Sequence, residues 1–107
     1  MQEQQENKAV AEFLVNIKFV WPESVSDETR AELRDRERAY AAELVKKGHL
    51  VRMWRVPGRK ENWGLWRAKD ATELHDVLTS LPVWPYMDLQ VHAVAKHPVD
   101  PLRHEDL

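Results

Sequence analysis

The sequence contains no cysteine and only three glycines among its 107 residues. The lack of cysteine excludes disulfide bonds and thiolate chemistry, and it fits a protein of a reducing cytoplasm. The glycines stand alone at positions 48, 58 and 64, which excludes a glycine-rich phosphate-binding loop. No Gly-x-Ser-x-Gly motif is present either, so the nucleophile elbow of serine hydrolases is also excluded.

The chain also lacks an excess of positive charge and any long apolar run. Its 16 basic and 18 acidic residues leave a net charge of −2, whereas a nucleic-acid binder usually shows a basic field. No apolar run is long enough to predict a transmembrane helix, and residues 1–8 lack the apolar core of a signal peptide. The five histidines show no metal-binding spacing. We therefore expect a cytoplasmic protein without a metal site, a nucleic-acid partner or a membrane partner.

The composition is typical of a soluble globular protein, with 43% hydrophobic and 32% charged residues. The length suffices for one domain with one core. We expect this domain to span residues 11–98, between a flexible N-terminal tail at 1–10 and a C-terminal tail at 99–107. Five tryptophans are many for so small a core. Some of them are therefore expected to line a pocket or a subunit interface, where aromatic residues are enriched.

Four segments of the sequence are typical of β-strands, at residues 13–20, 50–56, 62–67 and 87–95. In the last of them, apolar residues alternate with polar ones, which predicts one buried face. The turn at 57–61 is short and contains Pro-Gly, so the second and third strands should form an antiparallel hairpin.

Two segments are predicted to be helices. Residues 26–47 contain neither proline nor glycine, and they end at Lys46-Lys47-Gly48, a favourable C-terminus. The second helix begins at an Asp-x-x-Glu capping box, residues 70–73, and ends before a proline corner at 81–86. The residues expected to face the core are Leu33, Tyr40, Ala41 and Leu44 in the first helix, and Leu74, Val77, Leu78 and Leu81 in the second.

The order β-α-β-β-α-β predicts an α+β, ferredoxin-like fold, in which a four-stranded antiparallel sheet carries both helices on one face. Nothing in the chain would then cover the opposite face of the sheet. An uncovered apolar face usually binds another subunit, so we expect a homo-oligomer. The apolar residues from which that face is expected to be drawn are Leu14, Val20, Val51, Met53, Trp54, Trp66 and Val94.

Glu37 is the sharpest candidate for a catalytic residue. It interrupts the apolar stripe of the first helix, four residues after Leu33 and three before Tyr40. Desolvation there would raise the pKa of the carboxyl group, which suits a general acid or base near neutral pH. The alternative is a structural ion pair with Arg34, Arg38 or a strand arginine, on an exposed face.

Three polar residues of the predicted hairpin are further candidates. Arg52 and Arg55 should point to opposite faces of their strand, so that one can hold a carboxylate through two parallel hydrogen bonds. The alternative is a surface arginine whose stem covers the aromatic rings. Asn62 could direct its amide at a developing oxyanion, or it could simply stabilise the turn.

The chain resembles a known family in several short motifs, of which Leu81-Pro82-x-x-Pro85-Tyr86-Met87-Asp88 is the most specific. The others are Trp54-Arg55-Val56, Gly58, Asn62-Trp63, Glu73-Leu74-His75 and Ala95-Lys96-His97-Pro98. Together they resemble the muconolactone Δ-isomerases of the bacterial β-ketoadipate route. The resemblance covers residues 13–98, and Glu37 matches a glutamate that the family keeps in its first helix. The sequence departs from the family at Arg59-Lys60-Glu61, where Tyr-Ala is common, and at Trp66 and Trp84, where Phe is usual.

The resemblance implies a cofactor-free isomerase that shifts a proton within an unsaturated lactone bearing a carboxymethyl arm. It also implies a decamer or another dimer-based assembly. On this interpretation Glu37 is the catalytic base, Asn62 stabilises the enolate oxygen and Arg55 holds the substrate carboxylate. The other predicted substrate-binding residues are Arg52, Trp54, Trp66 and Tyr40.

Two alternatives to this function stay open on the sequence. The chain could act on a different lactone or enone acid in another pathway. It could also be a non-catalytic small-molecule-binding or assembly protein on the same fold, because a fold does not fix a function.

Overall fold

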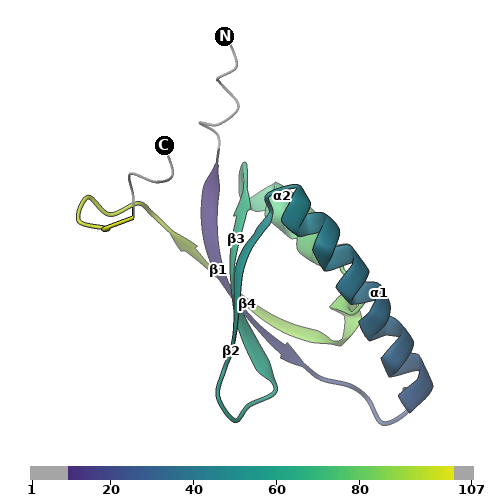
Figure 1. Cartoon of the computed structure of the whole chain (residues 1–107). Coiled ribbons are helices and arrows are strands. Elements are labelled where there is room, and N and C mark those ends of the chain that lie inside the picture. The colour runs from purple at the N-terminus through teal and green to yellow at the C-terminus, as the bar shows by residue number, and fades with distance from the viewer. Residues whose placement is uncertain (1–9, 103–107) are drawn as a thin grey trace.

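The structure is a computed structural model that describes residues 10–102, in which two helices lie on one face of a four-stranded sheet (Figure 1). The elements are β1 (Ala11–Phe19), α1 (Asp27–Lys46), β2 (Leu50–Arg55), β3 (Glu61–Ala68), α2 (Ala71–Thr79), a 3₁₀ helix (Trp84–Tyr86) and β4 (Met87–Val94). The strand order is β2-β3-β1-β4, and all three neighbouring pairs are antiparallel. The predicted ferredoxin-like fold is thereby confirmed.

Both helices begin at a capping side chain, and the cap of α2 is the one that the sequence predicts. The Ser26 hydroxyl accepts a hydrogen bond from the amide of Thr29 at the start of α1. At the start of α2, the carboxylate of Asp70 accepts one from the amide of Glu73. The Glu73 carboxylate reaches back as in a capping box, although it binds the amide of Lys69 rather than that of Asp70.

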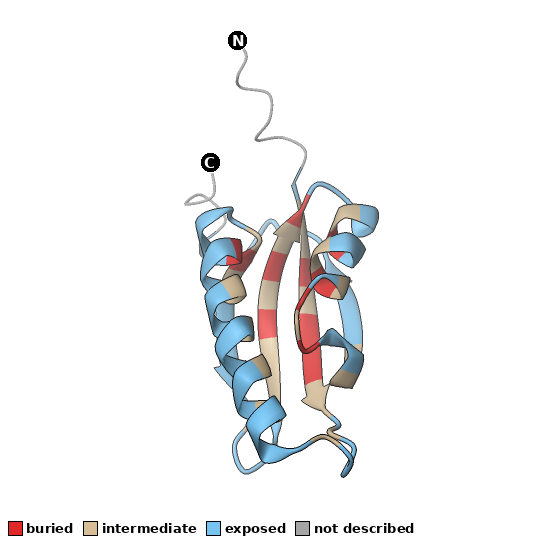
Figure 2. Cartoon of the chain, turned by 90° about the vertical axis from the view of Figure 1, so that its right-hand side faces the viewer, coloured by how far each residue is buried: buried red, intermediate tan, exposed pale blue. Residues whose placement is uncertain are grey.

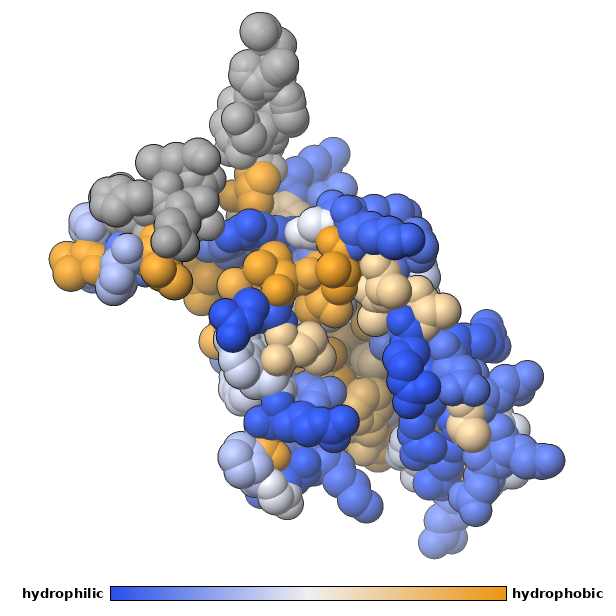
Figure 3. Space-filling view, viewed as in Figure 1, coloured by the Kyte–Doolittle hydropathy of each residue, from blue (hydrophilic) through white to orange (hydrophobic). Residues whose placement is uncertain are grey.

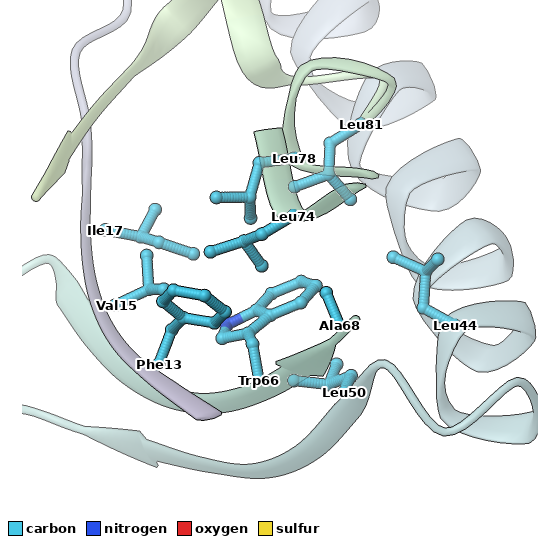
Figure 4. Packing of buried hydrophobic residues seen from close by; sticks show 10 residues of the cluster. All are labelled: Phe13, Val15, Ile17, Leu44, Leu50, Trp66, Ala68, Leu74, Leu78 and Leu81. Atoms are coloured by element: carbon cyan, nitrogen blue, oxygen red, sulfur yellow. The ribbon is translucent and has the colours of Figure 1, made fainter. Parts of the chain in front are cut away.

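The core lies between the sheet and the helices (Figure 4). Phe13, Val15 and Ile17 alternate along β1 and point to the helix side, where each is no more than 5% exposed. At the centre is Trp66, which is only 2% exposed. Burial of these large apolar side chains is the main force that holds the helices to the sheet. The rest of the cluster is formed by Leu44, Leu50, Ala68, Leu74, Leu78 and Leu81.

Helix α1 packs on the sheet less closely than predicted. Of the four residues expected to face the core, only Leu44 is buried, whereas Leu33, Tyr40 and Ala41 are half-buried. Figure 2 shows α1 exposed along most of its length, with the buried centre of the sheet visible between the two helices. The contact is therefore concentrated near the C-terminal end of α1, and its N-terminal part stands away from the sheet.

The face of the sheet opposite the helices is uncovered in the described chain. Trp54 and Val94 on this face are each 42% exposed. Two residues predicted for this face are in fact on the helix side, because Trp66 pairs with Phe13 and Met53 pairs with the buried Gly64. The oligomer predicted from the open face stays a prediction.

The predicted tails lie largely outside the described residues, apart from Val10 and residues 99–102, which are exposed. Among the described helices, none is both long enough and apolar enough to cross a membrane.

Candidate functional site

A cavity of about 770 Å³ opens between the N-terminal part of α1 and the sheet. It exists because the side of α1 that faces the sheet there carries charged residues. Arg30, Arg34, Glu37 and Arg38 all line the cavity, and they follow one another at helical spacing. Charged groups do not pack against an apolar sheet without partners, so the space stays open. Figure 3 shows this hollow, with hydrophobic residues on its floor and hydrophilic ones along both rims.

Glu37 lines this cavity and is half-buried. Its Oε1 accepts a hydrogen bond of 3.0 Å from the amide of Val83. Burial of the carboxyl group raises its pKa above the ordinary 4.5, and the hydrogen bond from Val83 opposes this only in part. Within residues 10–102 Glu37 forms no ion pair, so the predicted alternative of a salt bridge to Arg34 or Arg38 is wrong.

The donor to Glu37 comes from the proline corner. Pro82 and Pro85 have no N–H group, and the amides of Trp84 and Tyr86 are bonded within the corner itself. The amide of Val83 has no such partner and turns to α1 instead. The motif that marks the family resemblance therefore also fixes the position of the candidate base.

Arg55 and Asn62 line the same cavity as Glu37. They are directly paired across β2 and β3, at the end of the hairpin next to the turn. The Asn62 backbone is held by Asn16, whose side-chain amide donates a hydrogen bond of 3.3 Å to the Asn62 carbonyl oxygen. A guanidinium, an amide and a carboxylate with a raised pKa thus face one cavity.

An irregularity in β2 decides which arginine enters the cavity. The register shifts between Leu50 and Arg52, so Leu50 faces the core while Arg52 faces the open side of the sheet. Arg52 lies over the ring of Trp54, 4.9 Å from its centroid, and does not line the cavity. The prediction that the two arginines point to opposite faces is confirmed, and Arg55 is the one on the helix side.

The other predicted substrate-binding residues lie at different depths. Trp66 contributes to the floor of the cavity, although it is almost fully buried. Trp54 contributes to the rim, at the edge strand. Tyr40 does not line the cavity, because its hydroxyl lies 2.5 Å from the hydroxyl of Ser80, between the two helices. The roles of all these residues stay predictions.

The sequence reasoning missed an aromatic and cationic cluster at one end of the cavity. The rings of Trp21 and Tyr86 are stacked, with their centroids 5.0 Å apart. The guanidinium groups of Arg30 and Arg34 lie 5.5 and 5.7 Å from the Trp21 centroid. The signal in the sequence was the spacing of Arg30, Arg34 and Glu37 on one side of α1.

A second carboxylate, Glu61, lines the cavity in a different electrostatic state. It forms an ion pair with Arg59 and accepts a hydrogen bond of 3.1 Å from Asn16. Both hydrogen bonds lower the pKa of Glu61, and the one from Arg59 has the larger effect. The cavity therefore combines a carboxyl group with a raised pKa and one that is held ionised.

A profile described as muconolactone delta-isomerase matches residues 11–100 of the chain. The muconolactone Δ-isomerase of Rhodococcus opacus is 32% identical over 91 residues, which cover 85% of this chain and 98% of that protein. Muconolactone Δ-isomerase 1 of Acinetobacter lwoffii is 37% identical over 84 residues, covering 78% and 83%. A crystal structure of muconolactone isomerase superimposes with a TM-score of 0.78 at 28% identity, covering 84% of this chain and 94% of that one. The chain therefore belongs to the muconolactone Δ-isomerase family of enzymes.

Proposed function

We propose that this protein converts muconolactone to 3-oxoadipate enol-lactone by carboxylate acid–base catalysis. One observation carries the proposal: the half-buried carboxyl group of Glu37 has a raised pKa and no ion pair among the described residues. It shares its cavity with Arg55 and Asn62. The names of the relatives supply the substrate, and the geometry supports the roles of the residues.

The reaction requires one proton to leave the lactone and one to return. The Glu37 carboxylate takes the proton from the ring carbon that bears the carboxymethyl arm. The electron pair of that C–H bond forms the new C=C bond, and the old C=C bond shifts its electrons towards the carbonyl to give a dienolate. Glu37, now protonated, returns the proton to the carbon next to the carbonyl. The carboxylate is regenerated, so the step needs no cofactor.

The other two groups match the charges of this reaction. The Arg55 guanidinium binds the carboxylate of the arm through two parallel hydrogen bonds and thereby orients the ring. The Asn62 amide donates to the lactone oxygen, where negative charge develops in the dienolate. The raised pKa of Glu37 brings the group closer to neutral pH, where one residue serves better as both base and acid.

The test replaces Glu37 by Gln and follows the ultraviolet absorbance of muconolactone. Positioned acid–base groups contribute about 100- to 10,000-fold, so Glu37→Gln should lower kcat by at least about a hundredfold. The matched control is Glu61→Gln, which removes the other carboxylate of the cavity and should keep kcat within about fivefold, because a group held ionised is a poor proton carrier. Full turnover by Glu37→Gln would overturn the proposed role.

We also propose that the protein acts as a homo-oligomer. Support comes from the exposed Trp54 and Val94 on the open face of the sheet. A monomer mass in solution at micromolar concentration would exclude the assembly. The cytoplasmic location expected from the sequence stays a prediction.

A further inference from the structure

The cavity carries more positive charge than one substrate carboxylate requires. Six cationic side chains line it against the two carboxylates of Glu37 and Glu61. Muconolactone offers a single carboxylate, which the proposed function assigns to Arg55. The cations are Arg30, Arg34, Arg38, Arg55, Arg59 and Lys60.

Three of these six cations already have a structural role. Arg30 donates to the carbonyl oxygens of Val25 and Pro22, at 3.1 and 2.9 Å. Arg38 forms an ion pair of 3.0 Å with Asp35, and Arg59 forms one with Glu61. Within residues 10–102, Arg34 has no hydrogen bond and no ion pair, although it lies one helical turn before Glu37. Its charge is therefore available to a ligand in the cavity.

Arg34 is also held in place. Its guanidinium lies 5.7 Å from the centroid of the Trp21 ring, and that ring is fixed by its stack on Tyr86. A cation that is held over an aromatic face loses less freedom when it binds an anion than one on a free stem. Lys60 also has no ion pair within residues 10–102, but it lies in the exposed hairpin turn and has no such aromatic support there.

We propose that Arg34 forms a second anion-binding site beside Glu37, and that the preferred substrates are lactones carrying two carboxylates. One carboxylate binds Arg55 and the other binds Arg34, with the ring between them and next to Glu37. The inference rests on the proposed function, because it keeps the same proton transfer and changes only the class of substrate. A lactone with one carboxylate leaves Arg34 without a partner.

The experiment measures binding by tryptophan fluorescence, since Trp21 lies beside Arg34. The two probes are saturated γ-lactones with a carboxymethyl arm, one of which carries a second carboxylate on the ring. They have no C=C bond to shift, so binding is measured without turnover. Ionic strength is kept constant, because exposed charges are screened by salt. The native protein should bind the dicarboxylate at least about tenfold more tightly, as expected of one charge-assisted hydrogen-bonded contact.

Three variants distinguish a direct contact between Arg34 and the second carboxylate from the overall positive electrostatic potential of the cavity. Arg34→Gln should abolish the preference for the dicarboxylate, because it should weaken binding of the dicarboxylate far more than binding of the monocarboxylate. Arg34→Lys keeps the charge without the planar fork and should restore part of the preference. Arg38→Gln is the matched control, because it removes a charge from the same helix and the same cavity that is already paired with Asp35. It should keep the preference.

The site is overturned if the native protein shows no preference, if neither probe binds, or if Arg34→Gln retains the preference. It is also overturned if Arg38→Gln loses as much of the dicarboxylate preference as Arg34→Gln does, since the overall positive potential of the cavity would then explain the result. Turnover of muconolactone is measured separately on the native protein. Turnover of muconolactone without a preference for the dicarboxylate would refute only the second anion site. A preference for the dicarboxylate without any lactone isomerisation would refute only the proposed function.

Discussion

Gly64 in β3 offers a sharp test of how the core and the floor of the cavity are packed. A Cβ atom at this position would lie 2.6 Å from Nε1 of Trp66 and 2.7 Å from Sδ of Met53. Both distances are far below van der Waals contact, so something must move in Gly64→Ala. The backbone itself would accept alanine, because Gly64 has no positive φ.

The two neighbours differ in their freedom to move. Met53 is 43% exposed and can swing its thioether away, whereas Trp66 is 2% exposed and is enclosed by the core. Overpacking of a core costs about 1–3 kcal/mol. Alanine in a strand regains about 0.5–1 kcal/mol relative to glycine. We therefore expect Gly64→Ala to lower the free energy of unfolding by about 0.5–2 kcal/mol, which lowers Tm by several degrees for a domain of this size.

The measurement is urea unfolding of both proteins, followed by tryptophan fluorescence at one protein concentration, because any assembly makes stability concentration-dependent. A double-mutant cycle with Met53→Ala separates the two neighbours: Gly64→Ala should keep most of its cost when the thioether is absent, because Trp66 cannot move away. A Gly64→Ala protein as stable as the native one, or a cost abolished by Met53→Ala, would refute the packing described for β2 and β3.

Three further predictions concern the site. Because the pKa of Glu37 is raised above 4.5, kcat/KM should fall as the pH is lowered through a midpoint above that value, and a flat profile down to pH 4.5 would contradict the role of Glu37. The same shift makes the native state bind more protons than the unfolded state. The free energy of unfolding of the native protein, relative to that of Glu37→Gln, should therefore be highest at low pH, and this advantage should be lost as the pH rises through the folded-state pKa. Paired urea titrations at several pH values measure the difference. Arg55→Gln should raise the KM for muconolactone about tenfold or more, whereas Arg52→Gln should leave it within about twofold, because Arg52 lies over Trp54 on the other face of the sheet. Equal effects of the two arginine substitutions in steady-state kinetics would contradict this assignment.

The parts of the fold that depend on local chemistry could be predicted from the sequence. The helix cap at Asp70, the Pro-Gly turn and the proline corner before β4 each follow from side chains that act on their own neighbours. It was harder to predict which side chains of β2 and β3 face the helices. Strand β3 carries large aromatic residues on both faces, at Trp63 and Trp66, so the alternation of apolar residues could not decide between them.

The candidate site was predictable in its main groups and not in its arrangement. Glu37 was identifiable because a carboxylate interrupts an apolar stripe. The choice of Arg55 over Arg52 depends on the irregular register between Leu50 and Arg52, which has no signature in a single sequence. The position of Arg34 beside Trp21 depends on how far α1 stands from the sheet, which only tertiary packing sets.

The hydrogen bond between Glu37 and Val83 joins residues that are 46 positions apart in the chain. One comes from the first β-α-β half and the other from the corner between α2 and β4 in the second, so neither half alone holds the carboxyl group in place. A refolding intermediate in which the helices and the sheet have formed, but the proline corner has not yet docked on α1, would already have helical and strand signals while remaining inert. Recovery of enzyme activity should therefore report the last docking event of folding, later than the return of the circular dichroism signal.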